Sequence, residues 1–280
     1  MADIWMRDFA PVGMQTQTMF KYAPNYLKKA SAQYVQNRLS GMIKSICGNG
    51  SPHLPKLCSL VLDGGNVVSN HIDKAIVTSR VLDDNKTKTT SEVKQLLRAN
   101  LNCSKVAIIP EDGSRTGHAD GMVAFIDDNV IAVSETLDER NTEKLVDELQ
   151  HEFGTACKIV TLPSEYSSAT KWRKFESAAG LHVNLVATDN YLYVPVFGHD
   201  PKNAGQSHKL DDRVLREIIE NTRKAVVPVE VDNKICRMGG SVRCLSWQLA
   251  GPLADQLVKT ARKHGKKSDA RYESAKEPRR

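Results

Sequence analysis

The sequence predicts an α/β protein in which short strands alternate with helices and the sheets are mixed. Apolar runs of strand length recur along the 280 residues, and many are continuous, as is typical of strands buried on both faces. Helical patterns lie between the runs, and some neighbouring runs are joined by Asp- and Asn-containing turns that suit hairpins. A parallel doubly wound sheet is the alternative, but the chain has no Gly-rich phosphate loop to favour it.

The expected strands are bounded by turn residues. In chain order they cover 57–62, 75–78, 106–110, 122–126, 130–133, 158–162, 181–187, 191–197 and 225–229. Two hairpins are expected, one across Asp127-Asp128-Asn129 and one across Thr188-Asp189-Asn190. The repeated unit is a strand, a helix and a strand pair.

Four segments are expected to be helical because apolar side chains recur at three- and four-residue spacing. They cover 20–47, 91–99, 142–153 and 211–224. Ser91 and Glu92 suit a first helical turn, and Gly154 suits the stop after residue 153.

The composition indicates a soluble globular protein, with 40% hydrophobic and 26% charged residues. No apolar run approaches the roughly 18 residues that a membrane span needs, and the N-terminus lacks the layout of a signal peptide. The cysteines at 47, 58, 103, 157, 236 and 244 show no CxxC pair and no metal-ligand spacing. We therefore expect a reduced, cytoplasmic protein without a metal site, although the even cysteine count weakly favours disulfides.

The net charge of +6 is concentrated in residues 259–280, while the preceding residues are neutral as a whole. We therefore expect residues 251–280 to be a basic, disordered tail. Such a tail either solubilises the protein or contacts an anionic surface such as an acidic partner.

Three short segments supply two carboxylates, one imidazole and one thiol. They are Trp5-Met6-Arg7-Asp8, Gly117-His118-Ala119-Asp120-Gly121 and Gly239-Gly240-Ser241-Val242-Arg243-Cys244. If the middle segment is extended, His118 and Asp120 point to the same side. Taken singly, each segment is explained as well by a structural role, since most lone cysteines are small buried side chains. Together they suit a site that holds a planar cation and attacks its central carbon.

The order of the motifs resembles one known family. Trp5-x-Arg7-Asp8, Leu62-Asp63-Gly64-Gly65-Asn66, Gly117-His118-x-Asp120, His182-x-Asn184 and Gly239-Gly240-x-x-x-Cys244 follow one another as in agmatine deiminases and bacterial-type peptidylarginine deiminases. The resemblance runs from residue 5 to about residue 248. It implies the five-bladed α/β propeller (pentein-like fold) of the guanidino-group-modifying superfamily, in a single catalytic domain over residues 1–250. Because only four residues precede Trp5, we expect an incomplete N-terminal blade.

The resemblance also implies roles for individual residues. Cys244 would be the nucleophile and His118 the general acid and base, while Asp8 and Asp120 would clamp the guanidinium. Trp5 would pack on the substrate, Asn184 would order the site and Asp63 would shape the pocket. Arg243 departs from the family pattern, and we expect it to lower the pKa of the thiol or to recognise a substrate carboxylate. No cofactor is implied.

The resemblance implies hydrolytic deimination of agmatine to N-carbamoylputrescine and ammonia. The chemistry of these residues agrees with thiolate attack on a guanidinium carbon and a covalent amidino-cysteine. Peptidyl- or free-arginine deimination and amidino transfer are alternatives with the same chemistry. A non-catalytic, truncated family member that acts as a binding protein is the alternative of a different class. The expected partner is a small guanidino compound, agmatine or arginine-like, and the sequence leaves open whether the protein forms a homo-oligomer.

Overall fold

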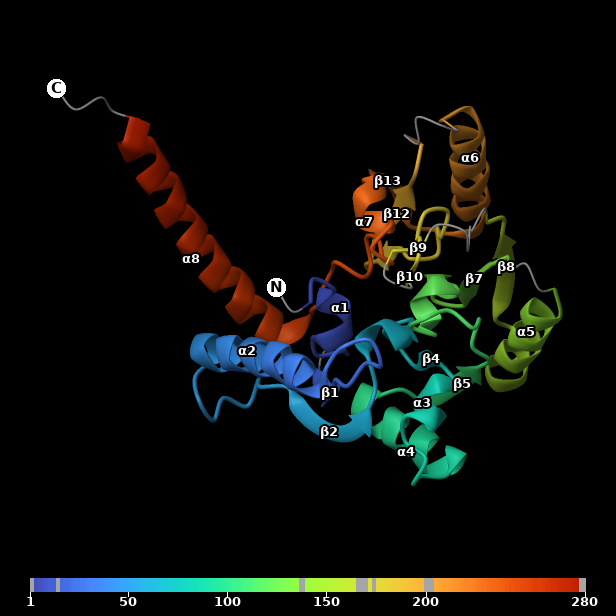
Figure 1. Cartoon of the computed structure of the whole chain (residues 1–280), viewed down its shortest axis with the longest axis horizontal. Helices are drawn as coiled ribbons and strands as arrows, with labels where there is room; N and C mark the ends of the chain where they lie inside the picture. Colours follow the sequence, from blue (N-terminus) through green and yellow to red (C-terminus); the bar gives the residue numbers. More distant parts are fainter. Residues whose placement is uncertain are drawn as a thin grey trace.

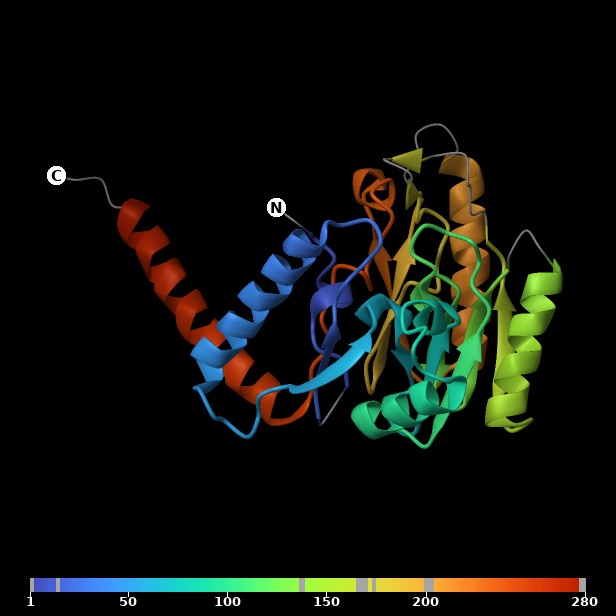
Figure 2. The ribbon, with the colours of Figure 1, turned by 60° about the horizontal axis from the view of Figure 1, so that its bottom comes forward.

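The computed structural model describes residues 3–13, 16–135, 139–164, 171–172, 175–198 and 204–276. It has the mixed α/β character that the sequence predicts, with separate sheets of two or three strands. Helices lie on the outer side of these sheets (Figure 1; Figure 2). None of the helices in the described ranges combines the length and apolar character that a membrane crossing needs.

Three stretches of the chain repeat one unit, in which a strand pair is followed by a helix and a third strand. The first unit consists of β3 (Val68–Ser69), β4 (Lys74–Thr78), α4 (Thr90–Leu101) and β5 (Lys105–Ile109). The second consists of β6 (Val123–Asp127), β7 (Val130–Ser134), α5 (Glu139–Phe153) and β8 (Lys158–Leu162). The third consists of β11 (Val186–Ala187), β12 (Tyr191–Val196), α6 (Ala204–Asn221) and β13 (Ala225–Glu230). In each unit the first two strands are antiparallel and the third runs parallel to the second. Both predicted hairpins are thereby confirmed.

The N-terminal stretch forms a related unit. Strand β1 (Thr18–Lys21) is followed by α2 (Lys29–Cys47) and by β2 (Lys56–Val61), which runs parallel to β1. Residue Val12 adds a single antiparallel bridge to β1. The prediction of one helix over 20–47 is wrong for its first residues, because Thr18–Phe20 are buried in a strand and Pro24 separates them from the helix.

Several short elements and one long helix, α8, complete the described chain. They are α1 (Met6–Phe9), the 3₁₀ turns Gly64–Asn66 and Ala119–Gly121, α3 (Arg80–Asp83), the antiparallel pair β9 (Lys171–Trp172) and β10 (Phe175–Glu176), α7 (Asn233–Cys236) and α8 (Gly251–Lys276).

Helix ends differ from the predicted ones where a cap lies outside the apolar pattern. Helix α4 begins one residue before Ser91, because Thr89 and Glu92 form a capping box in which each side chain accepts from the other residue's backbone N–H. The predicted strand 181–187 is reduced to Val186–Ala187, because the Asn184 amide donates to the Leu181 carbonyl in a turn.

The segment expected to be a disordered tail contains helix α8, which extends away from the rest of the molecule (Figure 1). Its first turns are apolar: Leu253 is buried, and Leu257 packs on the same cluster as Leu39 and Ile43 of α2. This packing stabilises the start of the helix, which a count of charges does not show. That the catalytic domain ends at residue 250 stays a prediction.

The core lies between each sheet and its helix. Leu97 of α4, Leu149 of α5 and Ile218 of α6 are each 0% exposed and lie in clusters that join strands of their own unit to strands of the preceding unit. Full burial of such a side chain contributes about 1.5–3 kcal/mol. The helices therefore stabilise the strands by packing on their faces, and the turns at the strand ends can carry the residues of a functional site.

We predict that Asp211→Ala lowers the free energy of unfolding by about 2–4 kcal/mol, because each buried donor left unpaired costs about 1–3 kcal/mol. The Asp211 carboxylate lies 2.7 Å from His182 Nε2 and accepts from the Phe197 amide at 3.0 Å, and both Asp211 and His182 are buried. Urea unfolding followed by circular dichroism measures the change. The matched control is Asp212→Ala, whose side chain is exposed on the same helix. Equal stability of the two variants would contradict this account.

Candidate active site

One pocket collects most of the residues that the sequence singles out. Six of them line it: Trp5, Asp8, His118, Asp120, Asn184 and Cys244. They come from α1, from the 3₁₀ turn at Ala119–Gly121 and from the turns before β11 and α8. Asp63 does not line the pocket but lies directly behind His118. The structure therefore places all seven predicted residues together, and their chemical roles stay predictions.

Cys244 is held at the end of a turn by Asn184. The Asn184 side-chain oxygen accepts from the Cys244 amide at 3.4 Å and from the Ser241 hydroxyl at 3.1 Å, while its nitrogen donates to the Asp120 carbonyl at 3.2 Å. The Cys244 sulfur lies 3.3 Å from the Asn184 nitrogen and 4.0 Å from an Asp120 carboxylate oxygen. The side-chain amide of Asn184 thus fixes the distance between the Cys244 thiol and the Asp120 carboxylate.

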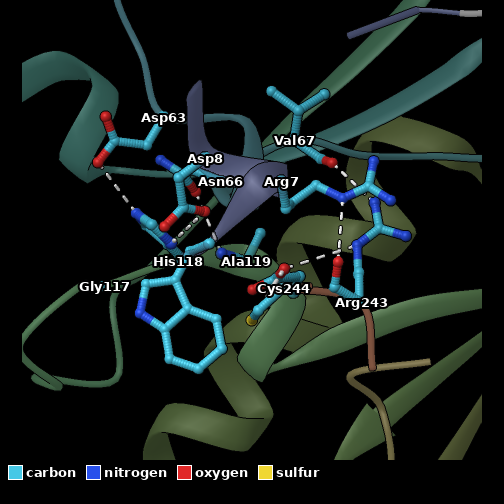
Figure 3. A network of polar contacts seen from close by, with 12 residues as sticks. Arg7, Asp8, Asp63, Asn66, Val67, Gly117, His118, Ala119, Arg243 and Cys244 are labelled. Atoms are coloured by element: carbon cyan, nitrogen blue, oxygen red, sulfur yellow. Dashed lines mark hydrogen bonds and ion pairs between the residues drawn. The ribbon is translucent and has the colours of Figure 1, made fainter. Parts of the chain in front are cut away.

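His118 lies between two carboxylates. Its Nε2 is 3.2 Å from Asp63 Oδ2, and its Nδ1 is 3.7 Å from Asp8 Oδ1 (Figure 3). The segment of His118 and Asp120 is not extended, because Ala119–Gly121 form a 3₁₀ turn, but both side chains line the same pocket. Asn66 holds that turn in place by accepting from the Ala119 amide at 3.2 Å.

Two glycines allow these groups to approach one another. A Cβ on Gly65 would lie 2.5 Å from Asp8 Oδ1 and 2.6 Å from His118 Nδ1. A Cβ on Gly240 would lie 2.6 Å from the Trp5 ring and 2.9 Å from the Cys244 Cβ. Contacts this short are excluded for carbon, so only glycine lets the imidazole meet Asp8 and lets Trp5 cover the cysteine turn.

Asp8 has one satisfied and one unsatisfied oxygen. Its Oδ2 accepts from the Tyr26 hydroxyl at 3.1 Å, whereas its buried Oδ1 has no hydrogen-bond partner among the described residues. Sequence reasoning missed Tyr26, whose ring also packs edge-on against Phe175 at the pocket wall. Its position just before α2 carries no motif, so nothing in the sequence pointed to it.

Arg243 does not face the pocket. Its guanidinium lies behind Asp120, with Nε 3.6 Å from the carboxylate, and the residue is 5% exposed. The expectation that Arg243 recognises a substrate carboxylate is therefore wrong. A buried cation beside Asp120 instead favours the charged form of that carboxyl group.

The electrostatics of the pocket separate its titratable groups. Burial raises the pKa of Asp8 to about 8 and also raises that of Asp120, with the charges of His118 and Arg243 opposing the rise. Burial lowers the pKa of His118, but Asp8 and the hydrogen bond to Asp63 outweigh it and raise that pKa to about 9. Burial and the charges of Asp120 and Asp8 raise the pKa of the Cys244 thiol well above its usual range. At pH 7 these shifts favour the protonated imidazole and the neutral thiol, and they leave Asp8 largely in its protonated form until a cation binds beside it.

The described residues contain no group of three or more His, Cys, Asp or Glu side chains that could hold a metal ion.

Solved structures with a similar fold include two agmatine deiminases. The agmatine deiminase of C. jejuni superimposes with a TM-score of 0.66 and 20% identity, covering 86% of this chain and 71% of that one. The agmatine deiminase of Enterococcus faecalis superimposes with a TM-score of 0.65 and 17% identity, covering 88% and 74%. No curated protein matches the chain. At these identities the likeness shows the fold.

The family match, together with the similar fold, defines the class of this protein, which is that of the guanidino-group deiminases. Residues 1–250 match the family described as Porphyromonas-type peptidyl-arginine deiminase. The chain belongs to that family.

We predict that iodoacetamide labels Cys244 slowly at pH 7 in the ligand-free protein, and that the rate rises about tenfold per pH unit up to pH 9, because only the thiolate reacts. The raised pKa of Cys244 is the reason for this direction. Mass spectrometry of the labelled peptide gives the rate at this cysteine alone.

Two variants test the cause of that raised pKa. Asp120→Asn removes a negative charge near the sulfur, so labelling should accelerate at pH 7. The matched control, Asp112→Asn, changes an exposed carboxylate at the pocket mouth and should leave the profile unchanged. Fast labelling of the unmodified protein, independent of pH between 6 and 9, would instead reveal a preformed thiolate.

Proposed function

We propose that the protein is a cysteine-dependent deiminase that hydrolyses a small guanidino compound, with agmatine as the first candidate, to N-carbamoylputrescine and ammonia. The observation that carries this proposal is the buried Oδ1 of Asp8, which lies 3.7 Å from the His118 imidazole but accepts no hydrogen bond within the described residues, so that it can accept one from a ligand inside the pocket. A guanidinium supplies planar, charged N–H donors to Asp8 and to Asp120, the second carboxylate that lines the pocket.

We also propose the five-bladed α/β propeller for this chain. The three repeated units and the related N-terminal unit support four blades. The fifth would then be incomplete, with few strand residues of its own.

The proposed reaction begins with a change in the charge of the thiol. The positive charge of the substrate favours the thiolate of Cys244, and the thiol proton leaves to solvent. The thiolate adds to the guanidinium carbon and forms a tetrahedral centre. Protonated His118 then gives its proton to one nitrogen, the C–N bond breaks, and ammonia leaves an amidino group bonded to sulfur.

Hydrolysis of that intermediate returns the protein to its starting state. Neutral His118 takes a proton from water, and the hydroxide adds to the amidino carbon. The C–S bond then breaks with the electron pair returning to sulfur, and the new hydroxyl group loses its proton as the ureido carbonyl forms. That proton returns the Cys244 thiolate to the thiol, while His118 keeps the proton that it took from water. Asp63 and Asp8 would hold the imidazole ring between them during both proton transfers, since each lies beside one ring nitrogen.

The far end of the substrate separates agmatine from arginine-like compounds. Agmatine is supported by the similar fold of agmatine deiminases, one of which was solved with its substrate bound. The pocket mouth carries Arg115 as well as Asp112 and Glu176, so it offers partners to an ammonium and to a carboxylate. Free or peptidyl arginine is therefore the second candidate, and the family match supports it.

A binding protein that retains the pocket without turnover is the alternative of a different class. A module of that kind needs carboxylates but has no use for a thiol held 4.0 Å from one of them. Cytoplasmic location, a homo-oligomer and an acidic partner for the basic residues 259–280 stay predictions.

We predict that the protein releases a ureido product from agmatine and that Cys244→Ala abolishes this turnover, because the alanine has no nucleophile. A colour assay for the ureido group, run with agmatine, arginine and an arginine-containing peptide, measures both statements and ranks the substrates. The matched control is Cys47→Ala, which removes a thiol at the end of α2. Turnover that survives Cys244→Ala would overturn the mechanism, and a lack of turnover with every guanidine would favour the binding protein.

We predict that Gly65→Ala lowers turnover by about a hundredfold, because displacement of catalytic groups by about 1 Å has effects of this size. The new methyl group would push Asp8 and His118 apart. The control, Gly41→Ala, adds the same methyl to an open position on α2 and should stabilise that helix by roughly 1 kcal/mol while leaving turnover unchanged. Full activity of Gly65→Ala would mean that the Asp8–His118 contact is dispensable.

A further inference from the structure

A second cavity, larger than the active-site pocket, lies on the other side of Arg243. It has a volume of about 810 Å³, which is in the range of pockets that hold small organic molecules. The two cavities share no lining residue. Arg243 lines the second one while its Nε lies 3.6 Å from Asp120, so a single side chain separates this cavity from the catalytic carboxylate.

Two buried guanidinium groups form one wall of this cavity. Arg7 is 4% exposed and Arg243 is 5% exposed, and both donate to the same neutral acceptor, Gln248 Oε1, at 3.1 and 3.4 Å. Figure 3 shows the two planar groups against each other. Each is a full positive charge, and the charge of Arg243 together with burial lowers the pKa of Arg7 to about 9.

The counter-charge beside this pair is incomplete. The carboxylate nearest to it is Asp120, which contacts Arg243 and which the proposed substrate would also use. Arg243 Nε faces Asp120 at 3.6 Å. Among the described residues, the terminal nitrogens of the pair donate only to uncharged acceptors, the Ser246 hydroxyl, Gln248 Oε1 and the Val67 carbonyl. Buried charges are ordinarily paired, so two cations that share one carboxylate can accommodate a further anion.

The other carboxylates that line the cavity do not supply a counter-charge to Arg7 and Arg243. Asp73 pairs with Lys74, Asp128 pairs with Arg223, and Asp189 is exposed. None of these three carboxylates forms an ion pair with Arg7 or Arg243 among the described residues. Lys224 adds a further cation at the wall, where its ammonium donates to the Thr188 carbonyl.

The lowered pKa of His71 indicates that the electrostatic potential in the cavity is positive. Burial and the positive charges of Arg243, Arg7 and Lys224 lower its pKa to about 3, so this imidazole is neutral at pH 7 and adds no charge. Its Nδ1 lies 3.1 Å from the Ser69 hydroxyl.

We propose that this cavity is a binding site for a small organic anion, whose carboxylate or phosphate group pairs with the guanidinium groups of Arg7 and Arg243. Guanidinium groups match both oxyanions by paired, charge-assisted hydrogen bonds. The cavity is much larger than a bare ion, which leaves room for the organic part of the ligand beside Trp247 and Leu249. The site is separate from the proposed deiminase chemistry and does not depend on it.

Isothermal titration at pH 7 tests the site with citrate, ribose 5-phosphate and inorganic phosphate, with ionic strength matched by sodium chloride. We expect saturable binding of citrate or ribose 5-phosphate, and the tighter of the two identifies the anionic group. Gln248→Glu puts a fixed carboxylate at the acceptor that both arginines share, so it should weaken anion binding by about tenfold or more. The same variant should melt at a higher temperature than the unmodified protein when no anion is present, because it supplies the missing counter-charge.

Controls distinguish a built site from a general response to negative charge. Gln33→Glu makes the same change at an exposed position on α2 and should keep the original affinity. As a second variant, Lys224→Gln should weaken binding severalfold. Lys209→Gln, which changes an exposed side chain on α6, should not weaken it. The proposal is overturned if no probe binds saturably at millimolar concentration, or if Gln248→Glu binds as tightly as the unmodified protein. These readouts are independent of turnover, so their failure leaves the proposed deiminase untouched.

Discussion

The structure of the pocket depends on the contact between the first turn of the chain and the turn that carries Cys244. The Arg7 amide donates to the Cys244 carbonyl at 3.1 Å, and the Arg7 side chain donates to the Arg243 carbonyl and to the Ser246 hydroxyl. These bonds fix Asp8 and Trp5 against the cysteine turn. Without them the pocket would lose one carboxylate and one wall at the same time.

Burial of charge is the second property that shapes this region. Asp8, His118, Asp120, Arg243 and Arg7 are each at most 6% exposed and lie in neighbouring positions. Charges in such an interior interact more strongly than in water, and a group without its partner is costly. The carboxylates of Asp8 and Asp120 therefore line the active-site pocket, whereas the guanidinium groups of Arg7 and Arg243 line the second cavity. Asp120, in contact with Arg243, joins the two sides.

Much of the fold could be predicted from local sequence. The hairpins at residues 127–129 and 188–190 follow from turn residues between apolar runs, and helix α4 follows from apolar spacing. The boundaries that failed depend on tertiary packing. Phe20 has the spacing of a helical residue but is buried in β1, and Leu253 gains its helix by packing beside α2.

The site was predictable as a set of residues but not as a geometry. The ordered motifs placed Asp8, His118 and Cys244 in one group, although no local pattern shows that a single amide, Asn184, links the thiol to Asp120. Tyr26 carries no motif, and Arg243, which was expected to act on the thiol or on the substrate, lies behind Asp120. Both depend on the direction in which a side chain leaves its backbone, which spacing along the chain does not determine.

The contact between Arg7 and Ser246 spans 239 residues, and this separation has a consequence for how the protein is made. During synthesis the carboxylate of Asp8 leaves the ribosome long before the thiol that it will face. The repeated strand and helix units can pack as they emerge, because their contacts are local, whereas closing the pocket must overcome the entropy of a loop that includes nearly the whole chain. The pocket can therefore close only after the turn that carries Cys244 has been synthesised, and until then Asp8 and the thiol cannot meet.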